Sequence, residues 1–248
     1  MIVIPSFERF QKIQEETLAF LKRHNINEDD IIIVVSEHDR QLDDYLTLKN
    51  VLVTKANKIG EVHNFITGVF DEGDFICELD DDVKDIVDKD LEPIPDFQKL
   101  IDTAKDLCIE NQCSYCGTYS VLNKMFMKGT QPITTDLRYC LGLVRFRFVR
   151  KEIQLETNYS EDFENCILHY KRDGKIVRMN HICGKTKNYA PGGCDGSGRN
   201  YESEKADKEF LATKYPKYTT LFQRKNKRWD LRLKDKTPTL EVYHETGF

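Results

Sequence analysis

The stretch Phe75-Ile76-Cys77-Glu78-Leu79-Asp80-Asp81-Asp82 ends an apolar run of strand character with three consecutive carboxylates. Oxygen ligands clustered where a strand of an α/β sheet ends suit Mg2+ or Mn2+, which keep several waters and take further ligands from substrate phosphates. The same triplet could instead cap the following helix, because Asp accepts backbone N–H bonds there and is favoured at the positive helix end. The first interpretation predicts a nucleotide or nucleotide-sugar as substrate, and the triplet alone leaves both interpretations open.

The residues before the triplet alternate between strand and helix patterns. Ile31 to Val35 is a β-branched run typical of a strand buried on both faces of a parallel sheet. We expect strands over 2–4, 31–35, 52–53 and 75–79, a helix with apolar spacing through 13–21, and a second helix over 62–70. This alternation predicts an α/β fold with a Rossmann-like, mostly parallel sheet. Its ligands should bind at the carboxyl ends of the strands, near Pro5-Ser6, Ser36-Glu37 and the acidic triplet.

The pattern changes after the triplet and predicts a mixed second half of the sheet. We expect helices over 96–110 and 161–170, and strands near 115–121, 142–149 and 175–179. Glycines and basic residues in 184–200 predict a flexible basic loop. No internal repeat or low-complexity linker is present, so we expect one domain over 1–220 and a basic C-terminal extension over 221–248.

Composition places the chain among ordinary globular proteins, with 248 residues, 40% hydrophobic and 32% charged. It has no run of about 18 apolar residues, which argues against a membrane span, and its N-terminus lacks the features of a secretion signal. We therefore expect a cytoplasmic protein without a membrane partner. The eight cysteines mostly lie in apolar patterns, typical of buried reduced thiols. Cys113 and Cys116 form a CxxC that Cys183 and Cys194 could complete as a zinc site, but no second CxxC or paired His follows.

Charge is unevenly distributed along a chain whose formal net charge is -5. Seven basic residues and one tryptophan lie near the C-terminus: Arg224, Lys225, Lys227, Arg228, Trp229, Arg232, Lys234 and Lys236. Basic side chains with an aromatic could follow a phosphate backbone. A solvated helix face is the alternative, because runs of charge are usually that.

A parallel half-sheet that ends in an Asp-rich turn and is followed by a mixed half resembles the GT-A glycosyltransferases, whose Asp-x-Asp turn holds a metal ion on a nucleotide diphosphate. Several segments, in order, also resemble the TET-associated glycosyltransferases, a family of phages, large viruses and some eukaryotes that includes the glucosyltransferase of base J synthesis. The segments are Ile4 to Arg9, Leu79 to Asp82, Thr134 to Tyr139, Glu161 to Glu164, and Lys185 to Tyr189 with Gly192-Gly193.

The resemblance implies transfer of a sugar from a nucleotide-sugar, with a UDP-sugar expected, to the hydroxyl of 5-hydroxymethylcytosine or another 5-hydroxymethylpyrimidine in DNA. It implies Mn2+ or Mg2+ as cofactor, with Asp80 and Asp82 as metal ligands. The donor-binding candidates are Pro5, Ser6, Arg9, Lys58, Gly60, Asn64, Asp80, Asp81, Asp136, Arg138, Lys185 and Lys187. The acceptor-binding candidates are Tyr189, Gly192, Gly193 and Arg199.

Each candidate has a structural alternative. Pro5 and Ser6 could simply cap the first helix, and Lys58, Gly60 and Asn64 could form an ordinary helix start. Asp136 and Arg138 stand two residues apart, a spacing that suits either contact with sugar hydroxyls or a mutual ion pair.

Asp162, with Glu161 beside it, is the candidate catalytic base, because an inverting transfer needs a carboxylate near the acceptor hydroxyl. A capping cluster at the start of a helix is the alternative for this acidic pair. Three other functions remain open. They are a GT-A enzyme that acts on a viral glycan of protein or lipid, a non-catalytic nucleic-acid-binding module, and a nucleotidyltransferase, in which acidic triads also bind metal-phosphate substrates. The acidic isoelectric point of about 5.8 argues against a DNA partner unless basic residues gather on one face.

Overall fold

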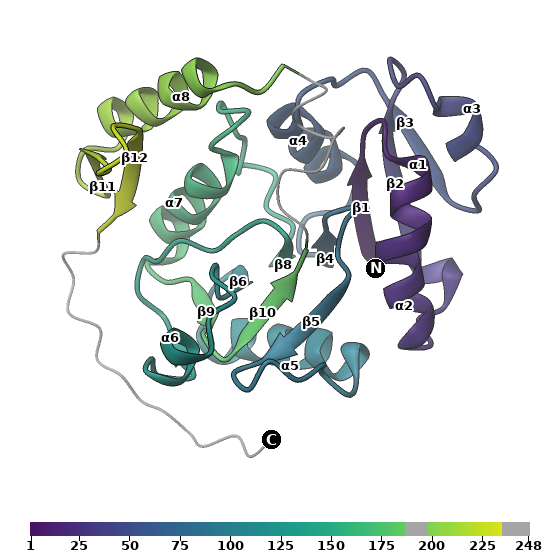
Figure 1. Ribbon diagram of the computed structural model, residues 1–248, viewed down its shortest axis with the longest axis horizontal. Coiled ribbons are helices and arrows are strands. Elements are labelled where there is room, and N and C mark those ends of the chain that lie inside the picture. The colour runs from purple at the N-terminus through teal and green to yellow at the C-terminus, as the bar shows by residue number, and fades with distance from the viewer. Residues whose placement is uncertain (187–197, 235–248) are drawn as a thin grey trace.

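The computed structural model describes residues 1–186 and 198–234 and contains an eight-stranded sheet with the order β3-β2-β1-β4-β8-β6-β9-β7. The first four strands in this order run parallel to one another (Figure 1). Their bounds are Ile2–Ser6 for β1, Ile31–Ser36 for β2, Val51–Thr54 for β3 and Phe75–Leu79 for β4. These are the strands that the sequence predicts before the acidic triplet.

Strand β8 (Val144–Phe148) joins the parallel half to a mixed half, since it runs antiparallel to both β4 and β6. The other strands of this half are β6 (Tyr115–Thr118), β7 (Ile133–Thr134) and β9 (Val177–Met179). Strand β9 is parallel to β6 and antiparallel to β7. The α/β class and the mixed second half are therefore confirmed. Strands β6, β8 and β9 are shorter than their sequence patterns predict, and the sequence does not predict β7.

Helices cover both faces of the sheet, and the alternation of side chains along β1 shows how. Ile4 packs in one core cluster with Phe20 and Phe97, whereas Val3 packs in another with Ile66. The first helical layer contains α1 (Phe10–Ile13), the π-helical turn Gln14–Leu18, α2 (Ala19–Arg23) and α5 (Phe97–Glu110). The second contains α4 (Ile59–Val69) and α7 (Glu161–Asp173). Short helical segments occur at Glu28–Asp30, Leu42–Tyr45 (α3) and Lys124–Lys128 (α6).

The end of α7 differs from its prediction. The sequence pattern predicts a helix to residue 170 and a turn at Asp173-Gly174, but the helix continues to Asp173. Gly174 then ends it with a φ of 75°, a left-handed conformation that glycine adopts without a steric cost. The following strand starts at Val177, two residues after the start that the pattern predicts.

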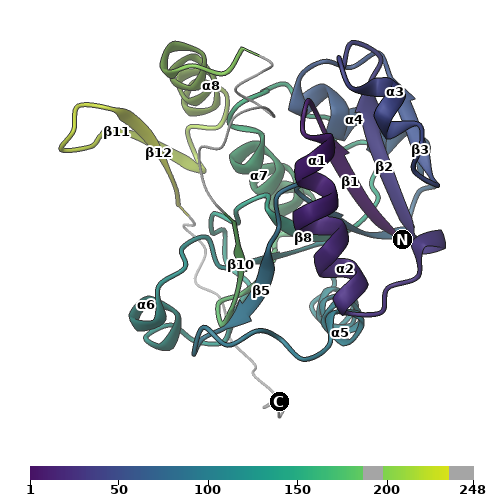
Figure 2. The same cartoon turned by 45° about the vertical axis from the view of Figure 1, so that its right-hand side comes forward.

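Two further antiparallel pairs lie beside the main sheet (Figure 2). Strand β5 (Asp85–Asp88) pairs with β10 (Ile182–Lys185) directly after the acidic triplet. Strands β11 (Thr219–Gln223) and β12 (Trp229–Leu233) form a hairpin next to α8 (Tyr201–Lys214). Leu231 of this hairpin is buried with Leu211 of α8 and Ile167 of α7, and the boundary expected at residue 220 falls inside β11.

The cysteines in the described ranges are free thiols in the interior: Cys77, Cys108, Cys113, Cys116, Cys140, Cys166 and Cys183. Among residues 1–186 and 198–234, no group of three or more His, Cys, Asp and Glu side chains is placed to hold a metal ion. The CxxC at Cys113 therefore has no complete zinc site within the described ranges, and Cys194 lies outside them. In the same ranges, no helix has the length and apolar character needed to cross a membrane.

Candidate active site

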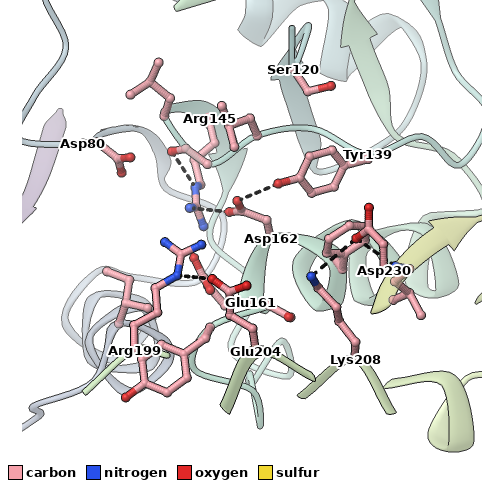
Figure 3. A pocket seen from close by; sticks show the side chains of 18 of the residues that line it. Asp80, Ser120, Tyr139, Arg145, Glu161, Asp162, Arg199, Glu204, Lys208 and Asp230 are labelled. Carbon is pink, nitrogen blue, oxygen red and sulfur yellow. Dashed lines mark hydrogen bonds and ion pairs between the residues drawn. The ribbon is translucent and has the colours of Figure 1, made fainter. Parts of the chain in front are cut away.

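A cleft of about 970 Å³ opens where the parallel strands end (Figure 3). Its walls include Ser6 at the end of β1, Ser36 at the end of β2 and the triplet Asp80–Asp82 after β4. The sequence predicts these three places to converge, and the structure brings them together. The first turn of α7 closes the opposite side with Glu161 and Asp162, so the two acidic segments share one cleft.

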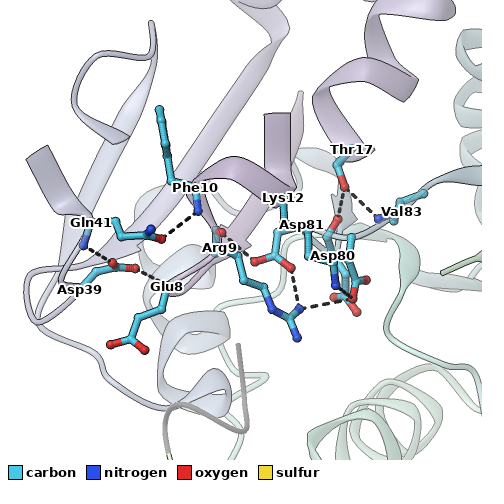
Figure 4. A network of polar contacts seen from close by, with 12 residues as sticks. Glu8, Arg9, Phe10, Lys12, Thr17, Asp39, Gln41, Asp80, Asp81 and Val83 are labelled. Carbon is cyan, nitrogen blue, oxygen red and sulfur yellow. Dashed lines mark hydrogen bonds and ion pairs between the residues drawn. The ribbon is translucent and has the colours of Figure 1, made fainter. Parts of the chain in front are cut away.

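Two of the three aspartates are held by the start of the first helix (Figure 4). Asp81 accepts hydrogen bonds from Ser6 Oγ at 2.7 Å and Arg9 Nη1 at 2.9 Å. Asp82 forms an ion pair with Lys12 at 3.0 Å and a longer one with Arg9 at 3.3 Å. Both carboxylates are buried, so these contacts fix their positions within the cleft.

The backbone of the acidic turn is fixed from the other side by Thr17, which lies in the π-helical turn. Its Oγ1 donates to the carbonyl of Asp80 at 2.8 Å and accepts from the N–H of Val83 at 2.9 Å. The Thr17 side chain is fully buried. A π-helical turn between two α-helical segments often marks a functional position, and here it places the hydroxyl that holds the turn.

Asp80 differs from its two neighbours, because no hydrogen bond or ion pair reaches its carboxylate from the described part of the chain. Burial and the nearby carboxylates of Asp82 and Asp162, partly opposed by Arg145, together raise the pKa of Asp80 to about 7. Burial and Asp162 likewise raise the pKa of Glu161 to about 8. The carboxylates of Asp80, Glu161 and Asp162 therefore repel one another within the cleft.

This arrangement fits a hard divalent cation. Mn2+ and Mg2+ commonly bind through one or two protein carboxylates and complete their coordination with water and substrate phosphates. Asp80 and Asp82 supply two such carboxylates, and their mutual repulsion is the type of field that a divalent cation relieves.

Asp162 is held in a fixed orientation at the start of α7. Arg145 Nη2 donates to its Oδ1 at 3.0 Å, and the hydroxyl of Tyr139 donates to its Oδ2 at 3.3 Å. The Arg145 side chain is 2% exposed. Burial alone would lower the pKa of Arg145, but the carboxylates of Asp162 and Glu78 raise it above its usual value, so the guanidinium stays charged.

Gly142 leaves space for this ion pair. A Cβ atom at position 142 would lie 1.9 Å from Arg145 Nη2 and 2.2 Å from Asp162 Oδ1. Both atoms are the ends of side chains that contact each other, so a Cβ at this position would displace that contact. A side chain at this position is therefore incompatible with the observed geometry of Asp162.

The other predicted site residues fall into three groups. Pro5, Ser6, Arg9, Lys58, Arg138 and Arg199 line the cleft. Arg138 Nε donates to Asp136 at 2.6 Å and Arg199 Nε donates to Glu204 at 2.6 Å, so both guanidinium groups also have acidic neighbours. Lys187, Tyr189, Gly192 and Gly193 lie outside the described residues.

Gly60, Asn64, Asp136 and Lys185 contact other parts of the chain and are not among the cleft-lining residues. Asn64 makes two hydrogen bonds with the backbone of Leu155, one as donor at 2.8 Å and one as acceptor at 2.7 Å. A Cβ on Gly60 would lie 2.1 Å from the carbonyl oxygen of Thr157. Lys185 ends β10 opposite Asp85 and is exposed.

Sequence reasoning missed Arg145. It singled out Arg224, Arg228 and Arg232 as basic residues but did not place them in a hairpin that lines the cleft. One signal was present, because Arg145 and Arg147 alternate with apolar residues in a strand between two other strands. A charged residue in such a strand needs a buried partner. Arg147 has Glu78, which also contacts His63 Nδ1 at 2.7 Å, and Arg145 has Asp162.

No protein-family model matches the chain, and no curated protein matches it. Several solved structures are similar to this chain in fold. Residues 1–349 of S. aureus TarS, in complex with UDP-GlcNAc, superpose with a TM-score of 0.56 at 15% identity, covering 86% of this chain and 65% of that one. This chain thus spans just under two thirds of the TarS chain. The chain has a GT-A-like fold.

Two mycobacterial structures give similar values over more of their length. Glucosyl-3-phosphoglycerate synthase from Mycobacterium tuberculosis, in complex with Mn2+, UDP and glucosyl-3-phosphoglycerate, has a TM-score of 0.51 at 12% identity. The match covers 94% of this chain and 85% of the synthase. A further mycobacterial protein has a TM-score of 0.52 at 11% identity over 94% and 82% of the two chains. At these identities the comparison establishes the GT-A-like fold of this chain.

Proposed function

We propose that this protein is a metal-dependent glycosyltransferase that uses a nucleotide-sugar donor. The observation that carries the proposal is the convergence of Asp80, Asp82 and Asp162 in one cleft at the carboxyl ends of parallel strands. Structures of the same fold contain UDP-GlcNAc in TarS and Mn2+ with UDP in the mycobacterial synthase. A UDP-sugar with Mn2+ or Mg2+ is accordingly the proposed donor complex.

Asp80 and Asp82 would hold the cation, and Ser6 and Arg9 keep the acidic turn in place. When bound, the cation supplies electrostatic stabilisation of the diphosphate leaving group. Asp81 is already paired with Ser6 and Arg9, which makes it a support for the turn and for the donor pocket. Lys58 and Arg138, on the cleft walls, are placed to contact the donor.

Asp162 is the proposed general base. In an inverting transfer it takes the proton of the acceptor hydroxyl while that oxygen forms the bond to the sugar carbon and the diphosphate leaves. Arg145 and Tyr139 occupy one side of each Asp162 oxygen and thereby orient the carboxylate. Glu161, whose pKa is raised to about 8, adds a second carboxyl group at the same helix start.

We further propose that the acceptor is the hydroxyl of a 5-hydroxymethylpyrimidine in DNA. The ordered segments that resemble the TET-associated glycosyltransferases support this acceptor, and each of the five includes residues that line the cleft: Arg9, Asp80, Arg138, Asp162 and Thr186 are examples. A target base within a duplex must leave the stack before its hydroxyl reaches the donor, at a cost of a few kcal/mol.

The test is to incubate the purified protein with a panel of nucleotide-sugars, Mn2+ and DNA that contains 5-hydroxymethylcytosine, and to weigh the released nucleosides by mass spectrometry. An added hexose mass establishes both the reaction and the acceptor. Asp162→Asn and the pair Asp80→Asn with Asp82→Asn should abolish the product. Asp102→Asn with Asp106→Asn, two exposed positions on α5, is the matched control and should leave it unchanged.

The possible failures are distinguishable. Donor hydrolysis that depends on Mn2+ and Asp80 but leaves the DNA unmodified would retain the donor site and reject the DNA acceptor, favouring a glycan acceptor. A protein that neither binds nor consumes any nucleotide-sugar with Mn2+ would reject the glycosyltransferase proposal itself.

A further inference from the structure

The β11–β12 hairpin has two chemically different faces. Thr220 pairs with Arg232 and Phe222 with Asp230, and the Arg224 N–H donates to the Arg228 carbonyl at 2.8 Å. Because side chains alternate along a strand, Phe222, Arg224, Arg228 and Arg232 project from one face. We call these four residues the arginine face.

The opposite face of the hairpin is apolar and packs on the rest of the protein. Leu231 is 4% exposed and lies in a cluster with Leu221, Leu211 of α8 and Ile167 of α7. The hairpin is thus attached to two helices, one of which carries Asp162 in its first turn. This attachment gives the arginine face a fixed place relative to the catalytic carboxylate.

Within an acidic protein, the arginine face carries three guanidinium groups, of which Arg224 pairs with Asp230 and Arg228 with Glu204. Residues 219–234 contain six Lys and Arg residues and a single acid, Asp230, although the whole chain has a net charge of -5. Asp230 is buried and already neutralised, since Arg224 Nε donates to it at 2.6 Å and Lys208 lies 3.4 Å away. The side chains of Arg224 and Arg228 remain 61% and 49% exposed.

The arginine face also belongs to the cleft. Phe222, Arg224, Arg228 and Arg232 all line the same cavity as Asp80 and Asp162. Trp229, Leu231 and Leu233 of the opposite face border it as well. The hairpin stands beside α7 and α8, on the side of the molecule away from β1 to β3 (Figure 1). The donor diphosphate belongs at the acidic turn, so the hairpin is left for the acceptor.

We propose that the arginine face docks the phosphodiester backbone of a single-stranded nucleic acid acceptor, which deepens and rests on the proposed function. Guanidinium groups match phosphate oxygens with two parallel hydrogen bonds. Arg232 already lies over the ring of Phe222 at 5.0 Å, which forms a flat surface on which an unpaired base can stack. An acidic peptide would use the charges but not this stacking surface.

The test compares Arg228→Gln with Arg232→Gln against Lys22→Gln with Lys105→Gln, which removes the same charge from exposed positions on α2 and α5. Binding of a fluorescent single-stranded DNA oligonucleotide is measured by anisotropy between 50 and 200 mM salt. Each lost phosphate contact should reduce the salt slope by about 0.7, so the hairpin pair should lose about 1.4 in slope and about tenfold or more in affinity at 50 mM salt. The control pair should retain both.

Binding of UDP with Mn2+, measured by calorimetry, should be equal in the wild type and both variants, which also shows that the hairpin variant is folded. Absence of oligonucleotide binding by the wild type, or an equal loss in the control pair, would overturn the docking proposal. Equal competition by polyglutamate would overturn it in favour of an acidic peptide. Hairpin-dependent oligonucleotide binding without UDP binding would support docking and reject the proposed function.

Discussion

Arg145 lies in the middle of the sheet, and its Nη2 atom donates to Asp162 Oδ1 at 3.0 Å, in the first turn of α7. Strand β8 places it there, since Arg145 pairs with Glu78 of β4, two residues before Asp80. One side chain therefore links the strand that carries the acidic turn to the helix that carries the proposed base. The relative position of the two acidic segments depends on this contact.

Replacement of Arg145 by Met should lower the free energy of unfolding by about 3–5 kcal/mol, because it leaves charged partners without their buried counter-charge. Urea unfolding at pH 7 measures the change. In the Asp162→Asn background the same substitution should cost clearly less, since one of these partners has gone. A cost below about 1 kcal/mol in the wild-type background would show that the ion pair does not hold the two segments together.

Gly142→Ala should reduce sugar transfer at least tenfold by displacing the Arg145–Asp162 pair, with which the new methyl group overlaps. Steady-state kinetics measure the effect. Gly68→Ala is the matched control, because its added Cβ meets nothing within 4 Å in the exposed last turn of α4. That variant should keep full activity and gain about 0.5–1 kcal/mol in stability from its better helix propensity. Equal activity of the two variants would contradict the positioning of Asp162 by this pair.

Stability of the metal-free protein should decrease with rising pH through the interval that Asp80 and Glu161 define. Their pKa values are raised to about 7 and about 8, so the folded protein keeps protons that the unfolded chain releases above its ordinary carboxyl range. Unfolding then releases protons, and the stability that these groups contribute below about pH 4 is lost progressively up to about pH 8. Thermal unfolding between pH 4 and 8 gives the melting temperature of the wild type and of the double variant Asp80→Asn with Glu161→Gln. The difference between the two pH profiles isolates this contribution.

Added Mn2+ should change the sign of that trend, because cation binding requires the ionised carboxylates. Affinity for Mn2+ should therefore rise between pH 6 and 8, with protons released into the buffer. Calorimetry in two buffers of different ionisation enthalpy counts those protons. A pH-independent affinity would show that Asp80 is not a ligand.

Asn64→Ala should destabilise the fold by about 1–3 kcal/mol, since it removes both hydrogen bonds to the backbone of Leu155. Chemical denaturation measures the loss. We expect the affinity for UDP with Mn2+ to stay within about twofold, because Asn64 does not line the cleft. A large loss of UDP affinity at unchanged stability would instead place Asn64 in the donor site.

The sequence was sufficient for the parallel half of the fold, because each element there carries its own periodic pattern. Ile31 to Val35 is unbroken and β-branched, and the acidic triplet follows an equally apolar strand. Residues at the carboxyl ends of parallel strands meet by topology, so Ser6, Ser36 and Asp80 could be placed together without knowledge of any side-chain contact.

Elements stabilised by distant contacts were not predictable. Helix α8 buries only Leu211 of its fourteen residues, so its sequence lacks a clear apolar stripe. From sequence alone, the hairpin segment has the pattern of a charged tail. Its burial depends on α7 and α8, which cover Leu231 in the folded protein. The contacts of Asn64 with Leu155 and of Gly60 with Thr157 cross more than ninety residues, a relationship that local patterns do not contain.

The hydrogen bonds of Thr17 have a consequence for the thermodynamics of cation binding. Because its hydroxyl holds both Asp80 and Val83, the loop of carboxylates is ordered when the chain folds and before any ion arrives. The entropy cost of ordering the backbone is therefore part of folding and not of ion binding, and the ion binds to a preorganised group of carboxylates. Selectivity among divalent ions in such a rigid site should follow ionic radius more closely than it would in a loop that adapts to the bound ion.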